Sequence, residues 1–496
     1  MSFVDALLIF LALVIIVVLV IGIRTLLFTR SAAPQPVPFP ASLPEPEIDP
    51  LIPAQHLSAA IKIETISHEN AAEDDPEKFA ELHHLLESTY PLLHSHLTRE
   101  VLDGGSLLYT WRGKDETLEP VLFMAHQDVV PVDEHTRGKW TYPPFSGAIA
   151  DGFIWGRGTM DIKCQLIGVM EAVEHLLEAG FKPLRCVFLA FGHDEEVLGL
   201  GAPRIVNLLK ERGIRLHAVI DEGTAVLDGV LPGFRGLTAA IAVTEKGYLS
   251  VKLTAESEGG HSSTPSSETS IGIISRAIHR LESKPFPHKL KTVEPMFKAF
   301  SPAASPLMKM AFANLWLFSG LVRRKLAALP ETAASIQTTT APTILRSGIK
   351  ENVLPSLAEA VVNFRILPGE TIAQVIEHVR NVIADERVQI APISTSAWEP
   401  SPVSPSDCQA YRHITTVVRE LYPGTTCAPN AMLGATDSRH YHAISDRVYR
   451  FTPIISQKED LPRVHGINER LSIDNMHKMV LFFYRIIQRW SSIEEK

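Results

Sequence analysis

A histidine and an aspartate two positions apart, His126 and Asp128, are the residues around which a chemical site can be built in this chain. They follow the apolar run VLFMA, which predicts a buried strand of a sheet covered on both faces. Because side chains two residues apart in a strand point to the same side, the carboxylate can lie near the imidazole and fix its tautomer. This arrangement is typical of a metal ligand with its supporting carboxylate, although alone it is more often structural.

A second candidate, Asp161, ends the glycine-rich segment GRGTMD and precedes a helix predicted over 164–179. The glycines permit a tight, irregular loop. A carboxylate held between that loop and the helix can bridge two cations, or it can simply cap the helix.

Further acids and a histidine follow other predicted strands. A buried strand over 185–191 runs into three consecutive acids, and the segment HAVIDEG ends in two more. Adjacent acids at a strand end repel one another, so a metal or solvent must absorb their charge. Far downstream, a histidine follows the predicted strand VYRFTPII and precedes a helix predicted over 474–490. These residues are Asp194, Glu195, Glu196, Asp221, Glu222 and His465.

The elements that must position these residues follow an α/β pattern. Helices are predicted over 56–66 and 76–94, and buried strands then alternate with helices. Parallel strands of such sheets place their chemistry at the carboxyl ends. From about Thr244 the pattern changes to alternating strands and amphipathic helices, so we expect a second, α+β unit.

Composition excludes several classes of protein. The chain has 496 residues, 45% of them hydrophobic, and can bury a large core in more than one domain. A net charge of −9 without a basic stripe argues against a nucleic-acid partner. The four cysteines have no CxxC or other pair spacing, so neither a disulfide scaffold nor a cysteine metal site is expected.

The N-terminus predicts a membrane segment. The stretch 6–23 contains no charged side chain and is just long enough to cross a bilayer. No basic residue precedes it, which favours an uncleaved single-pass anchor over a signal peptide, although a cleaved segment would make the protein secreted. Arg24 and Arg30 favour a cytoplasmic body. The proline-rich stretch 31–53 predicts a semi-extended tether.

Five ordered blocks of sequence carry a family resemblance. In the order HQD, GRGTMD, DEE, DEG and VHG, they resemble the co-catalytic zinc hydrolases that include aminoacylase and carboxypeptidase S. The likeness spans about residues 50–490, and stretches such as TTTAPTI, NFRILPGET and TDSR are most similar to members that cleave and form N-fatty-acyl amino acids. The resemblance implies a mixed-sheet di-zinc exopeptidase domain with an inserted α+β, ferredoxin-like lid.

The resemblance also implies a domain division and two Zn²⁺ per subunit. The domains would be an anchor or signal segment 1–30, a tether 31–53, catalytic parts 54–243 and 394–496, and a lid 244–393. One zinc would be held by His126, Asp161 and either Glu222 or Asp221, and the other by Asp161, Glu196 and His465. Glu195 would be the general base and Asp128 the carboxylate behind His126.

The lid is expected to contribute to substrate binding. His261 in GGHSSTP matches the family residue that polarises the substrate carbonyl, and in family dimers it comes from the other protomer, so a homodimer through the lid is implied. Arg365 or Arg439 would pair with a free substrate carboxylate. The remaining expected substrate contacts are Asn352, Gly434 and Thr436.

The expected activity is zinc-dependent hydrolysis of N-acyl amino acids with long acyl chains, with formation of the same compounds in reverse. A carboxypeptidase acting on small peptides needs the same metals and is the nearest alternative. A non-catalytic binding protein on this fold would require a lost catalytic residue, and none of the expected residues is missing. The apolar stretch 307–322 fits a lid core, a subunit interface, or a wall for an acyl chain or the bilayer.

Overall fold

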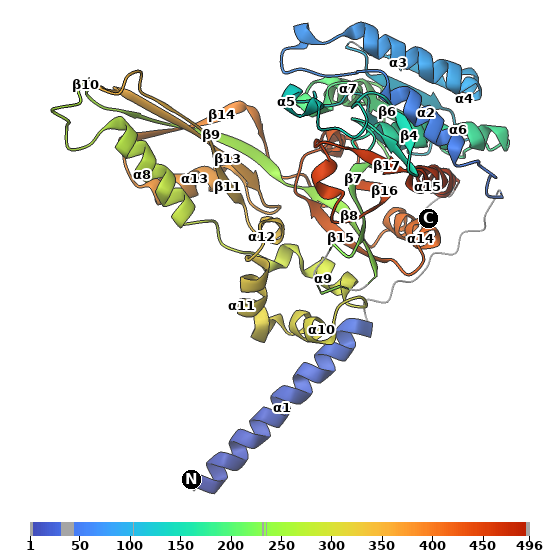
Figure 1. Ribbon diagram of the computed structural model, residues 1–496. Helices are drawn as coiled ribbons and strands as arrows, with labels where there is room; N and C mark the ends of the chain where they lie inside the picture. The colour runs from blue at the N-terminus through green and yellow to red at the C-terminus, as the bar shows by residue number, and fades with distance from the viewer. Residues whose placement is uncertain (1–2, 31–43, 103, 231–232, 235, 493–496) are drawn as a thin grey trace.

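The protein consists of a main body, an arm-like second sheet and a long N-terminal helix that extends away from the body by itself (Figure 1). The computed structural model describes residues 3–30, 44–102, 104–230, 233–234 and 236–492. The predicted tether lies largely at 31–43, outside the described residues.

The body is built on an eight-stranded mixed sheet in which the central strands are parallel. All six residues of β3 are buried, as the apolar run predicts for a strand covered on both faces. In sheet order the strands are β1 (Thr98–Val101), β2 (Leu107–Trp111), β6 (Val187–Gly192), β3 (Val121–His126), β7 (Ala218–Asp228), β16 (Val448–Ser456), β8 (Leu237–Glu245) and β15 (Thr426–Met432).

Helices cover both faces of this sheet. On one face α6 (Lys163–Glu178) and α15 (Ile473–Ser491) share a single apolar core with β3, and α7 (Gly201–Glu211) packs on the other face. The Ser472 hydroxyl accepts the Asn475 amide and fixes the start of α15. The other elements of the body are α2 (Leu51–Ile61), η1 (Ala71–Glu73), α3 (Pro76–Thr89), α4 (Pro91–His96), α5 (Glu134–Arg137), β4 (Ala148–Ala150), β5 (Phe153–Trp155), η2 (Glu195–Val197), α14 (Gln409–Leu421), η4 (Asp437–Ala443), η5 (Leu461–Arg463) and β17 (Arg470–Ser472).

Two predicted helices have different bounds. The helix expected over 56–66 is α2, which begins at Leu51 within the predicted tether because Pro53 is tolerated in a first turn. The helix expected over 76–94 is two helices, α3 and α4, which meet at Tyr90. Pro91 lacks the N–H that would continue α3, so it starts a new helix instead.

The second sheet, here called the lid sheet, has four antiparallel strands with α8 (Ser270–Ser283) and α13 (Ile372–Ile383) packed on it. Every second residue of β13 is buried, which is the alternation expected of a sheet covered on one face. The order fourth, first, third, second along the chain is the ferredoxin-like arrangement that the resemblance implies, whereas the exact boundaries 244 and 393 stay predictions. The strands are β14 (Val388–Trp398), β9 (Gly247–Glu256), β13 (Leu357–Ile366) and β11 (Thr339–Ser347).

A small hairpin-like pair, β10 (Gly260–His261) and β12 (Val353–Leu354), lies at the outer end of the lid sheet (Figure 1). Between α8 and β11 the chain forms a group of short helices, here called the junction helices, near the inner end of α1 (Phe3–Arg30). They are α9 (Glu294–Phe300), α10 (Pro306–Ala313), α11 (Leu315–Leu326) and α12 (Pro330–Ile336), preceded by η3 (Leu290–Thr292).

Among the described residues, α1 is the one helix long and apolar enough to cross a membrane, and none of its residues is buried. By length and composition alone, such a helix near the N-terminus fits an anchor or a signal sequence.

Candidate active site and metal centre

Five predicted ligands meet at the carboxyl edge of the main sheet. The Nε2 of His126, at the end of β3, lies 3.1 Å from Asp161 Oδ1 and 3.5 Å from Glu222 Oε1. The Nε2 of His465 lies 3.0 Å from Asp161 Oδ2 and 3.1 Å from Glu196 Oε2. Asp161 therefore stands between two histidines, with one carboxylate oxygen toward each.

The register of the parallel strands explains why these residues meet. His126 of β3 pairs with Gly192 of β6, and Phe123 pairs with Ile220 of β7. The acids that follow Gly192 and Ile220 are therefore held near the end of β3. Among the described residues, two sets of three have possible ligand atoms within 4.8 Å of one another: His126, Asp161 and Glu196, and His126, Glu195 and Glu222. Both sets draw on predicted residues, although neither equals a predicted zinc set.

The glycine-rich loop delivers Asp161 because two of its glycines have no room for a side chain. A Cβ on Gly156 would lie 2.4 Å from the Ile61 side chain, and one on Gly158 would lie 2.7 Å from Val129. Both glycines have positive φ, which other residues rarely adopt. The loop therefore packs tightly on the body and ends at Asp161.

Asp128 holds both the histidine and the acidic segment after β6. Its Oδ1 lies 3.3 Å from His126 Nδ1, and its carboxylate accepts the backbone amides of Glu195 and Glu196 at 3.2 and 3.0 Å. The Ser67 hydroxyl donates to it at 2.6 Å. Burial opposes the charged form of Asp128, but these hydrogen bonds outweigh it and lower the pKa of the carboxyl.

The structure separates the two neighbouring acids of β7. Asp221 accepts the backbone amides of Glu222 and Ser438, at 2.8 and 3.0 Å, and so faces the backbone. In the ladder with β16, Asp221 pairs with Arg450 and the next pair is Thr224 with Phe451, so Glu222 and Gly223 form a bulge. Bulges re-aim side chains, and Glu222 here turns toward His126. The predicted strand end after HAVIDEG is wrong, because β7 continues through this bulge to Asp228.

The charges of the cluster fit divalent cations. Burial and the nearby charge of Asp161 raise the pKa of Glu222 to about 8, and burial also raises the pKa of Glu195 and Glu196. Within the described part of the chain, Glu196 Oε1 is buried without a hydrogen-bond partner. Imidazole and carboxylate groups are the ligands that zinc takes in catalytic sites. A cation among them would remove the mutual repulsion of the acids.

Two residues that sequence reasoning did not select support the site. Glu469, fully buried, accepts the Met160 amide at 2.7 Å and the Arg157 guanidinium at 2.6 Å. Arg157 also donates to the His465 carbonyl at 3.0 Å. This pair ties the loop of Asp161 to the loop of His465. The available signal was that Arg157 and Glu469 lie within four residues of predicted ligands.

The two candidate carboxylate-binding arginines bracket a pair of stacked aromatic rings. The guanidinium of Arg365 lies 4.7 Å from the Tyr248 ring centroid, and that of Arg439 lies 4.7 Å from the Trp398 ring centroid. The two rings stack with centroids 4.8 Å apart. Arg439 also donates to the carbonyl of Thr436 at 2.7 Å, and the amide of Thr436 donates to Glu245. These residues line the connection between the lid sheet and the body.

Other predicted lid residues lie far from the cluster within one chain. His261 is exposed in β10, and the carbonyl of Asn352 accepts the Ser262 amide beside it. Figure 1 places β10 at the outer end of the lid sheet, remote from β6 and β7. The structure therefore does not bring His261 and Asn352 to the metal ligands of their own chain.

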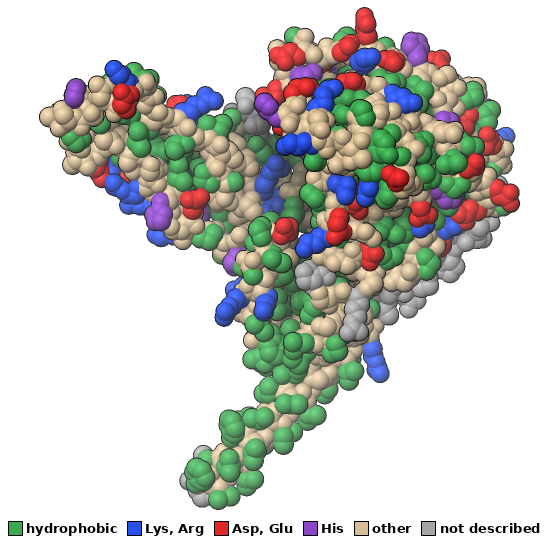
Figure 2. Space-filling view, viewed as in Figure 1, with side chains coloured by type: hydrophobic (Ala, Val, Ile, Leu, Met, Phe, Trp, Pro, Cys, Tyr) green, Lys and Arg blue, Asp and Glu red, His purple; other side chains and the backbone are tan. Residues whose placement is uncertain are grey.

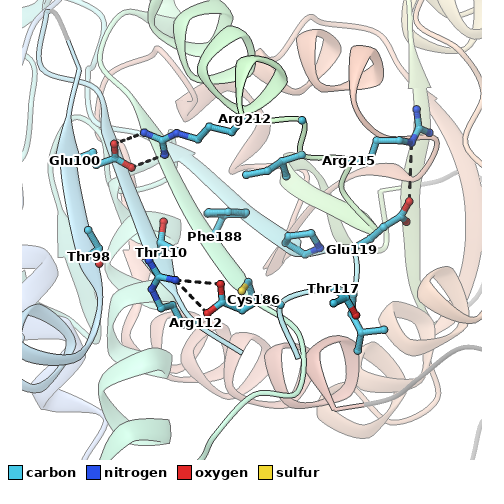
Figure 3. A pocket seen from close by; sticks show the side chains of 15 residues that line it. Thr98, Glu100, Thr110, Arg112, Thr117, Glu119, Cys186, Phe188, Arg212 and Arg215 are labelled. Carbon is cyan, nitrogen blue, oxygen red and sulfur yellow. Dashed lines mark hydrogen bonds and ion pairs between the residues drawn. The ribbon is translucent and has the colours of Figure 1, made fainter. Parts of the chain in front are cut away.

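A separate hollow of about 570 Å³ lies at the opposite edge of the main sheet, as Pro120 and Cys186 in its wall directly precede β3 and β6. Figure 3 shows its arginines paired with glutamates. The pairs are Arg112 with Glu116, Arg212 with Glu100, and Arg215 with Glu119. This hollow contains none of the predicted site residues.

Comparison with known proteins agrees with this arrangement. The sequence profile of peptidase family M20/M25/M40 matches residues 122–489. The chain belongs to this family. As a member of family M20/M25/M40, it is a metal-dependent hydrolase of amide bonds.

Two relatives within the M20 family are equally similar. The N-fatty-acyl-amino acid synthase/hydrolase of Xenopus tropicalis is 40% identical over 438 residues, which cover 87% of this chain and 84% of the relative. The protein named probable carboxypeptidase S-like 2 of Dictyostelium discoideum is 40% identical over 441 residues, which cover 88% of this chain and 84% of the relative.

Solved structures share the M20 fold. The metallo-carboxypeptidase Sso-CP2 of Sulfolobus solfataricus aligns with a TM-score of 0.64 and 17% identity, covering 88% of this chain and 99% of that one. Human carnosine dipeptidase 1 aligns with a TM-score of 0.62 and 15% identity, covering 89% and 96%. At these identities the likeness shows the fold alone.

Proposed function

We propose that the chain hydrolyses N-acyl amino acids with long acyl chains, and that it can form them from fatty acid and amino acid in reverse. The observation that carries this proposal is the intact cluster around Asp161, in a chain 40% identical to an N-fatty-acyl-amino acid synthase/hydrolase over most of both lengths. A peptidase that removes a C-terminal residue is the second candidate, favoured by the equally similar carboxypeptidase S-like relative.

The proposed metal sites share Asp161. His126, Asp161 and Glu222 would hold one zinc, and Asp161, Glu196 and His465 would hold the other. The short distances from each histidine to Asp161 support this sharing, and the bulge supports Glu222 over Asp221 as the ligand. When bound, zinc lowers the pKa of a water molecule and polarises the scissile carbonyl.

Glu195 is proposed as the general base. It begins η2, is buried, and belongs to the cluster with His126 and Glu222. Its carboxylate takes a proton from the attacking water and passes it to the leaving amine. Asp128 is a positioning residue in this scheme, because it orients His126 and the amides of the acidic segment.

Substrate recognition is proposed to use the lid and the loop before η4. A guanidinium binds a free carboxylate through two parallel hydrogen bonds, which suits the carboxylate of an acylated amino acid. Arg439 is the candidate nearer the body, with Gly434 and Thr436 beside it, whereas Arg365 lies on β13 of the lid sheet. His261 and Asn352 are proposed to reach the site of a second protomer, since they lie remote from their own.

We also propose that α1 is a retained anchor with the body on the cytoplasmic side. The Asn314 side chain is buried and donates to the Ile21 carbonyl at 3.4 Å and to the Thr25 hydroxyl at 3.2 Å. Cleavage after α1 would strip these partners from a buried amide group, which is unfavourable. Chemical sequencing of the mature N-terminus in membranes tests the anchor directly.

The test of function compares two substrates on the full-length chain in neutral detergent. We expect rapid cleavage of a long-chain N-acyl phenylalanine and little cleavage of a blocked dipeptide, with loss of activity on chelation and recovery on return of zinc. Incubation with free fatty acid and phenylalanine would show the reverse reaction. The opposite substrate preference would assign the chain to the carboxypeptidases, and no zinc-dependent turnover of either substrate would refute both.

A further inference from the structure

The inner end of α1 and the junction helices line a solvent-open cavity that the proposed reaction does not use. It has a volume of about 570 Å³ and is here called the junction cavity. Arg24 and Phe28 of α1 form one side of it, and Phe297, Phe312 and Trp316 of the junction helices form the other. Helix α1, the candidate membrane span, thus forms part of the wall of a cavity large enough to hold a small ligand.

Partly buried polar contacts hold α1 against this cavity. Arg24 Nε donates to the Ala313 carbonyl at 3.3 Å, and Asn314 donates to Ile21 and Thr25 of α1. The indole N–H of Trp316 donates to Asn314 Oδ1 at 3.3 Å. Because such contacts need a defined geometry, α1 leaves the body in a set direction.

The cavity lies at the depth of lipid head groups if α1 spans a bilayer. The apolar part of α1 ends at Ile23, and a helix of that length covers roughly the 30 Å of the hydrocarbon core. Arg24 then falls where hydrocarbon gives way to head groups. Long basic side chains at that level extend toward the interface.

The junction helices present an apolar surface at the same level. Leu307 of α10 is 70% exposed, and Trp316 and Leu321 of α11 are 55% and 54% exposed. In Figure 2 hydrophobic side chains cover the region where α1 joins the body, so the apolar surface is continuous with α1. The basic run Arg323, Arg324 and Lys325 ends α11. Exposed apolar side chains beside a basic run are typical of helices that lie in a membrane interface.

The charge of the junction cavity favours an anion. Three cationic side chains, Arg24, Lys291 and Lys298, line it with one carboxylate, Glu294. Among the described residues none of these cations forms an ion pair with a carboxylate, although the whole chain carries a net charge of −9. The Phe297 and Phe312 rings behind them stack with centroids 4.1 Å apart. A ligand with an anionic head and an apolar chain matches both parts of this lining.

We propose that the junction cavity binds the head group of an anionic phospholipid, with α10 and α11 seated in the interface of the bilayer that α1 enters. The proposal rests on the membrane insertion of α1 proposed above. A bound lipid would neutralise the cations and bridge α1 to the junction helices. The lid sheet, whose strands β9 and β11 lie before and after these helices in the chain, would then be held at a fixed height above the membrane.

The test uses the full-length chain in nanodiscs of neutral phosphatidylcholine, with or without phosphatidylglycerol. Native mass spectrometry should show phosphatidylglycerol retained by the wild type and lost at least about tenfold more readily by the double variant Lys291→Glu, Lys298→Glu, since each basic residue near an anionic surface contributes about 1 kcal/mol. The single variant Lys350→Glu reverses one charge between β11 and β12, outside the cavity lining, and should retain lipid as the wild type does.

A second measurement tests the seating of the helices. Lipids brominated on the acyl chain should quench a component of the tryptophan fluorescence that disappears in Trp316→Phe. Zinc content and turnover of a short-chain, water-soluble N-acyl amino acid should stay unchanged in all three variants, which separates failure of this proposal from failure of the proposed function. Equal retention of phosphatidylglycerol by the double variant, absence of Trp316 quenching, or preferential binding of free fatty acid over phospholipid would overturn the proposal.

Discussion

Crowded carboxylates define the site at the scale of single residues. Glu195, Glu196 and Glu222 are each harder to ionise than a free carboxyl group, because burial raises their pKa, whereas Asp161 between two histidines keeps a pKa below its usual range despite burial. The two hydrogen-bonded acids raise the pKa of His465 to about 10. Either a proton on each histidine or a zinc ion bound at each histidine would therefore neutralise the excess negative charge of these carboxylates.

The proposed base can be separated from the ligands beside it. Glu195→Gln removes the proton acceptor but leaves His126, Asp161 and Glu222 in place, so we expect bound zinc to be retained and turnover to fall roughly a hundredfold to ten-thousandfold. Glu196→Gln, the matched change at the adjacent residue, should lose zinc instead. Metal content after dialysis, measured beside turnover, checks both. Loss of zinc from the Glu195 variant would mean that base and ligand are exchanged.

Because of the bulge in β7, we predict different roles for the adjacent acids Asp221 and Glu222. Glu222→Gln should release one zinc, because its carboxylate faces His126. Asp221→Asn should keep both metals and lower the free energy of unfolding by about 1–3 kcal/mol, because it weakens a buried acceptor of two backbone amides. Metal analysis and thermal unfolding of both variants distinguish the two roles. A metal loss confined to Asp221→Asn would reverse the assignment.

Residue types and their order predicted which side chains gather, but not how each is aimed. His126, Asp161 and His465 could be selected because their strands and loops carry clear sequence signals. The choice between Asp221 and Glu222 depended on a ladder shift against β16, a partner more than 200 residues away, which no local pattern records. Glu469 was missed for a similar reason, since its partner Arg157 lies 312 residues away in the chain.

At the scale of elements, the position of a helix depends on close packing against its neighbour as well as on the apolar periodicity of its own sequence. α6 and α15 share one core, and Gly168 of α6 lies against Met479 of α15, where a Cβ would be 2.8 Å from Met479 Cγ. The periodicity of each helix predicted both of them within one or two residues. It could not predict this contact, because a glycine inside a helix gives no sign of what approaches it.

A pair of glycine variants tests this contact. Gly168→Ala should lower the free energy of unfolding by about 1 kcal/mol, since overpacking of about 1–3 kcal/mol exceeds the gain in helix propensity. Gly272→Ala in α8 is the matched control, because its Cβ would make only an ordinary 3.4 Å contact with Thr269 Oγ1. We expect it to be neutral or stabilising by a few tenths of a kcal/mol. Melting temperatures of the two variants give the comparison, and equal values would contradict it.

At the scale of the whole molecule, the arrangement of the parts was the least predictable. An α+β unit could be expected from the strand and helix pattern, and its ferredoxin-like lid form from the family resemblance. Its placement as an arm that carries His261 away from the metal ligands depends on the few residues where β8 passes into β9 and β14 returns to the body. Those residues include Glu245, whose fully buried ion pair with Arg450 at 2.8 Å anchors the connection to β16.

The stack of Arg365, Tyr248, Trp398 and Arg439 lies at this connection, and only the contact of Arg439 with Trp398 crosses from body to lid sheet. If Arg439 binds the substrate carboxylate as proposed, its guanidinium would leave the Trp398 ring, and ligand binding would then be linked to this contact between body and lid sheet. We expect a substrate analogue to change the tryptophan emission of the wild type and not of Trp398→Phe, with Trp490→Phe as a control in the core. Unchanged emission in the wild type would count against the link.

With such a signal, Trp398 would be an intrinsic fluorescence probe of the contact between body and lid sheet. Lid opening could then be timed in milliseconds by stopped flow, without a label and without waiting for product to form.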